Sequence, residues 1–142
     1  MKVYPDANIY VTYLLGQKGE ALCDRFFKQG IGCRFSLVAS NTMFAEVAQR
    51  CGRSSLMLFQ KNIDDYKKVR KLEVIAEKPA IFSSADELNR KTGRKYGLND
   101  ITHVLLASEN ADVFVTSDRN LATFASKYVK AVLLESFVES EF

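Results

Sequence analysis

The stretch that decides the fold runs from Leu98 to Asp118 and reads LNDITHVLLASENADVFVTSD. Its first half predicts a helix that carries Asp100 in its first turn and ends near Asn110. A short apolar strand, 112–116, then leads to Asp118. Asp6 also follows a short apolar strand, at the start of the chain. Because α/β folds gather helix starts and strand ends at one edge of the sheet, these three carboxylates indicate a functional site.

The same alternation of short strands and helices extends outward to both ends of the chain. It predicts a three-layer α/β/α domain with a central, mainly parallel sheet. No internal repeat or linker interrupts the pattern, so we expect a single domain over residues 1–142. We expect a helix beginning at Ser83 or Ser84 and a polar tail after the last strand. The expected strands are Lys2–Tyr4, Cys33–Ala39, Glu73–Ala76, 112–116 and 129–134.

The composition is that of a globular protein, with 142 residues, 47% of them hydrophobic and 26% charged. The longest apolar runs are far below the roughly 20 residues that a membrane span needs. Asp6 and Asn8 interrupt any apolar region that a signal peptide would require at the start. We therefore expect a cytoplasmic protein without a membrane span.

Cysteine and histidine offer little catalytic potential. The three cysteines show no CxxC spacing, which argues against a disulfide framework and against a zinc site. The single histidine, His103, lies within an apolar helical pattern, and we interpret it as a packed core residue rather than a catalytic one. Carboxylates remain as the main candidates, and they favour hard cations such as Mg²⁺ or Mn²⁺.

Each candidate acid also has a structural interpretation. Asp6 and Asp118 could cap the helices that follow them, and Asp100 could complement a helix dipole. Glu46 lies about one turn into a helix and could pair with Arg50 on the solvated face. Taken together, carboxylates that meet at one edge would repel one another unless a cation neutralised them. A shared edge would therefore indicate a metal ion.

Four pieces of sequence carry a resemblance to a known family. They are 6–11 (DANIYV), Ser40 six residues before Glu46, Asn99-Asp100 with 106–107 behind it, and 115–118 (VTSD). With these pieces in this order, the chain resembles the PIN-domain nucleases, most closely the VapC-type toxins of toxin–antitoxin pairs. The resemblance covers essentially the whole chain.

The resemblance implies a set of roles for these residues. Catalysis and the binding of Mg²⁺ or Mn²⁺ would fall to Asp6, Glu46, Asp100 and Asp118. A metal-activated water would then attack an RNA phosphodiester. Asn8 and Thr116 would orient the acids, while Ser40 could support the site or cap a helix. One departure is Pro5, because a proline in a central strand could end that strand early and shift Asp6.

The net charge of +3 permits a polyanionic partner without demanding one. Basic residues gather in two clusters, at 90–95 and 61–71, and a solvated helix face is the favoured interpretation of each. As phosphate contacts we consider Arg90, Lys91, Arg94, Lys95 and Arg119. The resemblance further implies an RNA substrate, a cognate antitoxin protein and a homodimer.

Two other functions are compatible with the same sequence. One is a PIN nuclease of RNA processing that has no antitoxin. The other is a catalytically inert PIN-like module that binds RNA or protein. A phosphatase using Asp6 as its nucleophile is disfavoured, because Asn8 stands where a second aspartate would be expected.

Overall fold

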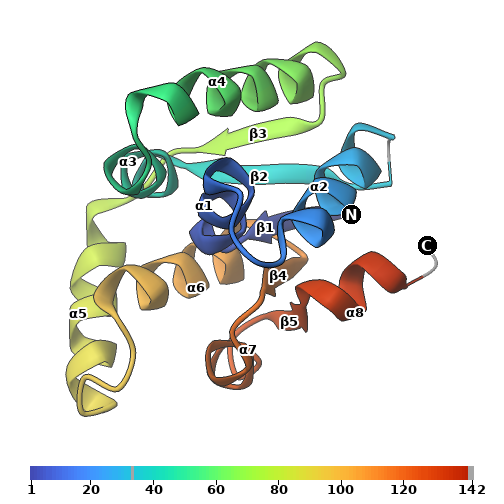
Figure 1. Cartoon of the computed structure of the whole chain (residues 1–142). Helices are drawn as coiled ribbons and strands as arrows, with labels where there is room; N and C mark the ends of the chain where they lie inside the picture. The colour runs from blue at the N-terminus through green and yellow to red at the C-terminus, as the bar shows by residue number, and fades with distance from the viewer. Residues whose placement is uncertain (33, 141–142) are drawn as a thin grey trace.

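A five-stranded sheet forms the centre of the computed structural model, which describes residues 1–32 and 34–140. The strand order is β3-β2-β1-β4-β5 and each pairing is parallel, which confirms the expected type of sheet (Figure 1). The strands are β1 (Lys2–Pro5), β2 (Ser36–Ser40), β3 (Leu72–Ile75), β4 (Val113–Thr116) and β5 (Lys130–Leu133).

Helices lie on both faces of this sheet and complete the expected three layers. α6 packs on β1, β2 and β4 and against α5, while α1 packs against α2, α3 and α4. None of the described helices is long and apolar enough to cross a membrane. The helices are α1 (Ala7–Leu15), α2 (Glu20–Ile31), α3 (Asn41–Arg50), α4 (Arg53–Lys68), α5 (Pro79–Lys91), α6 (Leu98–Asn110), α7 (Arg119–Ala125) and α8 (Leu134–Glu139).

Pro5 does not shorten the first strand. It is the last residue of the central strand β1, where it is paired with Val115 of β4. The next residue, Asp6, donates its N–H to the Val115 carbonyl at 2.8 Å. The pairing with β4 therefore continues past the proline, which cannot donate a hydrogen bond itself, and Asp6 follows the strand directly.

The start of α5 differs from the expectation. The helix begins at Pro79 with Lys78 as its N-cap, and not at Ser83 or Ser84. Proline suits the first position of a helix, because its fixed φ is helical and the missing N–H would have no partner in the helix. Pro79 therefore marks the beginning of α5 and not a break before it.

The C-terminal segment is also more ordered than expected. Instead of a polar tail, α8 follows β5 directly and buries Leu134, Phe137 and Val138. The expected strand at Cys33–Ala39 is observed as β2, Ser36–Ser40, and Cys33 itself lies outside the described residues. The alternation of elements was predicted well, whereas their ends required the packing to be known.

Candidate active site

Three adjacent central strands end at the edge of the sheet where the candidate acids lie. β2, β1 and β4 are neighbours, and they end at Ser40, Pro5 and Thr116 respectively. Asp6 follows β1 and Asp118 follows β4. Because parallel strands end on the same side, residues distant along the chain meet at this edge.

The Asp6 carboxylate is fully buried and held by two polar neighbours. Oδ2 accepts a hydrogen bond from Thr116 Oγ1 at 2.9 Å, and Asn8 approaches with its side-chain amide at 3.4 Å and its backbone N–H at 3.5 Å. Thr116 Oγ1 also accepts from the Asp118 N–H at 3.1 Å, so one hydroxyl links both strand ends. Burial raises the pKa of Asp6 above its usual range.

Asp118 also caps a helix. Its Oδ1 accepts from the N–H groups of Asn120 and Leu121 at 2.9 and 3.1 Å, at the start of α7. Asp6 is likewise the N-cap of α1. The capping interpretation is therefore correct for both residues, and it fixes their side chains at the same edge.

Glu46 lies on α3 with a side chain that is only 10% exposed. Its Oε1 lies 3.3 Å from His103 Nε2, and its Oε2 lies 3.5 Å from Arg50 Nη1. The hydrogen bond from His103 is the main cause that lowers the pKa of Glu46. Arg50 Nη1 also donates to Asn8 Oδ1 at 2.5 Å and so connects α3 with α1. The Arg50–Glu46 pair was expected, but the contact with Asn8 was not.

Asp100 lies within the electrostatic reach of the other three acids. It lies in the first turn of α6, as predicted, although the N-cap is Gly97 and the helix begins at Leu98. Burial, followed by the negative charges of Asp6, Glu46 and Asp118, raises its pKa to about 6. The structure therefore brings the charges of all four predicted acids to one region.

The donor set fits a hard divalent cation, since it consists of carboxylate oxygens whose mutual repulsion a cation would relieve. Within residues 1–32 and 34–140, however, no three histidine, cysteine, aspartate or glutamate side chains stand close enough together to hold a metal ion. Metal binding is therefore part of the functional proposal below.

Ser40 and His103 both have more than one contact. Ser40 caps α3 through its Oγ, which accepts from the Met43 N–H at 3.1 Å. Its hydroxyl also lies 2.8 Å from Tyr4 Oη. His103 is completely buried, as expected of a core residue, yet it reaches Glu46. The capping role of Ser40 was expected, whereas the contacts of Tyr4 with Ser40 and of His103 with Glu46 join residues from four different elements.

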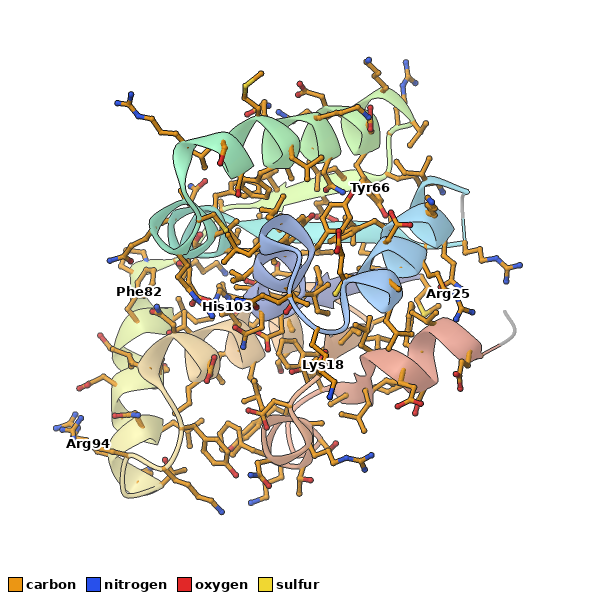
Figure 2. All side chains as sticks on the ribbon, viewed as in Figure 1. Lys18, Arg25, Tyr66, Phe82, Arg94 and His103 are labelled. Carbon is orange, nitrogen blue, oxygen red and sulfur yellow. The ribbon has the colours of Figure 1, made fainter. Side chains whose placement is uncertain are left out.

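The basic candidates lie in two places, with four of them on or just after α5 and Arg119 at the start of α7. Arg90 and Lys91 pair with Asp86 and Glu87 on the exposed face of α5, both at 3.2 Å. Arg94 follows α5, and in Figure 2 it points outward from the end of the α5–α6 hairpin, well away from His103. Lys95 lies in the same segment as Arg94, with its Nζ 5.7 Å from the centroid of the Tyr96 ring, whereas Arg119 directly follows Asp118 at the start of α7.

Arg119 lines a cavity of about 380 Å³ beside the acidic edge. Lys18, from the loop between α1 and α2, contributes a second cation to this cavity, and Figure 2 shows Lys18 below that loop. Leu22 and Leu133 provide apolar walls. Sequence inspection did not select Lys18, which is separated from Asp118 by 100 positions.

Comparison with known proteins agrees with the fold. The PIN domain family model matches residues 3–127. A chain in the crystal structure of VapBC2 from Rickettsia felis, bound to a DNA fragment from their promoter, is similar in fold, with a TM-score of 0.59 and 16% identity over 94% of this chain and 98% of that one. PAE2754 from Pyrobaculum aerophilum gives a TM-score of 0.58 and 16% identity over 97% and 93%.

A search of curated proteins finds no match to this sequence. The family assignment rests on the family model, which spans most of the chain, and the two solved structures agree with it in fold. PIN domains are nucleases that generally use divalent metal ions. By its sequence and its fold, this chain belongs to the PIN-domain family.

Proposed function

We propose that this protein is a metal-dependent endoribonuclease that hydrolyses RNA phosphodiester bonds. The observation that carries the proposal is that the negative charges of Asp6, Glu46 and Asp118 act on Asp100 at one edge of the sheet, in a chain of the PIN-domain family. Such crowding of like charges is unfavourable without a cation, and a fold maintains it where charge is needed for chemistry.

These four carboxylates would hold Mg²⁺ or Mn²⁺. A bound divalent ion lowers the pKa of a water molecule and stabilises negative charge on phosphate oxygens. Thr116 and Asn8 hold the Asp6 carboxylate in a fixed direction. Arg50 and His103 contact the two oxygens of Glu46 from opposite ends of the carboxylate. The protein thereby fixes its ligands before a metal arrives.

RNA phosphates would bind along the cavity that Lys18 and Arg119 line beside Asp118. Cations in this position attract the backbone without distinguishing its bases. Arg90 and Lys91 are weaker candidates, because each already pairs with an acid on its own helix. Arg94 and Lys95 lie beyond that helix, in the segment before α6.

The cleavage assay follows directly from this assignment. Structured and unstructured RNAs are incubated with Mg²⁺, Mn²⁺ or chelator, using the wild type, Asp6→Asn and Asp100→Asn. Cleavage requires the cation and is lost in both variants. Asp64→Asn is the matched control, because Asp64 lies on α4, where its Oδ1 accepts a hydrogen bond from Gln60 Nε2 at 2.9 Å. Equal cleavage in chelator contradicts the mechanism.

We further propose that the protein is the toxin of a toxin–antitoxin pair, acting as a homodimer restrained by an antitoxin protein. The similarity of fold to a chain of the VapBC2 structure supports this role. Expression of the wild type then arrests growth, while expression of Asp100→Asn does not. Cleavage in vitro without growth arrest favours an RNA-processing nuclease instead, and the absence of cleavage with any cation favours an inert binding module.

A further inference from the structure

A chain of four polar side chains runs from the interior to the acidic edge. Ser40 Oγ lies 2.8 Å from Tyr4 Oη, Tyr4 Oη lies 2.7 Å from His103 Nδ1, and His103 Nε2 lies 3.3 Å from Glu46 Oε1. The first three residues are completely buried. They come from β2, β1 and α6, and Figure 2 shows His103 in the interior between α3 and α6.

The direction of each hydrogen bond follows from what each group can donate. Ser40 Oγ already accepts from the Met43 N–H, so its own hydrogen is available for Tyr4 Oη. Tyr4 can then donate to Nδ1 of His103. At the other end the Glu46 carboxylate can only accept, which requires a proton on Nε2. A neutral imidazole with its proton on Nε2 satisfies all of these contacts.

From this arrangement we infer that His103 is a positioning residue for Glu46, with Tyr4 and Ser40 holding the imidazole ring so that Nε2–H points at Oε1. The inference rests on the proposed function, since it concerns how one proposed metal ligand is oriented. A ligating carboxylate is effective only when its direction is fixed, and a buried donor fixes it without competition from water.

The contacts of Glu46 explain why the histidine is needed. Arg50 approaches Oε2 at 3.5 Å but is 45% exposed and also bonds to Asn8. An exposed, shared guanidinium holds a carboxylate loosely. The imidazole is rigid, completely buried and held at its far nitrogen by Tyr4. His103 is thus the firmer of the two contacts.

The first experiment uses nuclear magnetic resonance of the ring nitrogens. Because His103 is the single histidine, its signals need no assignment by mutation. In the metal-free wild type we expect a protonated Nε2 and an unprotonated Nδ1, and we expect Mg²⁺ to shift the ring signals. A proton on Nδ1 alone overturns the inference, and this readout does not depend on any nuclease activity.

The second experiment compares two amide substitutions by calorimetric titration with Mn²⁺. In His103→Asn the amide nitrogen corresponds to Nδ1 and loses Glu46, whereas in His103→Gln it reaches the place of Nε2. We expect His103→Asn to raise the dissociation constant about tenfold or more, and His103→Gln to recover most of the affinity. Equal affinities of these two variants overturn the inference.

A third comparison removes one buried hydroxyl at each of two places. Tyr4→Phe frees the imidazole, while the control Tyr66→Phe removes a hydroxyl that donates to the Phe27 carbonyl at 2.6 Å, away from the acids. We expect weaker Mn²⁺ binding and a mixed tautomer in Tyr4→Phe only. Equal behaviour of the two variants overturns the inference. If the wild type binds no Mn²⁺, the proposed function fails, while the tautomer still decides the hydrogen-bond arrangement.

Discussion

The aromatic cluster between α4 and its neighbouring helices and the acidic edge of the sheet make opposite contributions to stability. In the aromatic cluster, formed by Tyr10, Phe27, Phe59 and Tyr66, Tyr10 lies 4.7 Å from Phe27 and 5.1 Å from Phe59 between ring centroids. Such contacts between rings are favourable in themselves. At the acidic edge, burial and then the repulsion from neighbouring carboxylates raise the pKa of Asp100. Packing in the aromatic cluster stabilises the fold, whereas the repulsion between carboxylates at the acidic edge destabilises it.

The largest expected effect separates these two regions. Asp100→Asn should lower cleavage on the order of 100-fold or more, because it removes one of the four carboxylates proposed to hold the divalent ion. In the absence of divalent ions the same change should leave the free energy of unfolding unchanged or increase it, since a repulsive charge is lost. Cleavage rates and denaturant unfolding measure the two effects. A large loss of stability would contradict the assigned repulsion.

Gly30→Ala tests the aromatic side. An added Cβ would meet Tyr66 Oη and lie 2.8 Å from its Cε1. Overpacking of this kind costs about 1–3 kcal/mol, and disturbing the Tyr66 hydrogen bond costs about 0.5–1.5 kcal/mol more. Activity per folded molecule should remain. Gly52→Ala is the control, because its Cβ would meet nothing within 4 Å. Equal destabilisation by both changes would show that packing against Tyr66 is unimportant.

The pH dependence of stability should carry the signature of the acidic edge. The pKa of Asp100 is raised to about 6 from 3.8, so between these values the folded state binds the proton more tightly than the unfolded state. Protonation of Asp100 therefore stabilises the folded state fully below pH 3.8, and this stabilisation is lost as the pH rises through about 6. The free energy of unfolding of the wild type, relative to Asp100→Asn, should therefore decrease from pH 4 to 7 without divalent ions. An increase of this difference in the free energy of unfolding between pH 4 and 7 would contradict the raised pKa of Asp100.

The smallest expected effect extends the acidic edge to its substrate. Lys18→Ala and Arg119→Ala should each weaken RNA binding and reduce the slope of log affinity against log salt by about 1. Arg90→Ala should change little, because Arg90 pairs with Asp86 on the outer face of α5. Fluorescence anisotropy over a range of salt concentrations gives both quantities. Equal slopes of log affinity against log salt for the three variants would show that RNA does not bind along the cavity beside Asp118.

Much of this molecule follows from local pattern. Alternating apolar segments predicted the parallel sheet, and the positions after strand ends predicted where Asp6 and Asp118 lie. The wrong expectations concern ends of elements, where local signals compete. Pro79 can end a helix or begin one, and only its packing after β3 decides between them. Likewise, α8 is stabilised by burying the side chains of Leu134, Phe137 and Val138 in the core.

What the sequence by itself determined is the class of fold, the edge at which the acids gather and the family, because these depend on periodicity and on order along the chain. Only the tertiary structure decided which side chains touch. Tyr4 and His103 are separated by 99 positions, and Arg50 and Asn8 by 42, yet each pair forms a hydrogen bond. Such contacts depend on which strands and helices are neighbours and on how far each side chain reaches, and no local pattern records either.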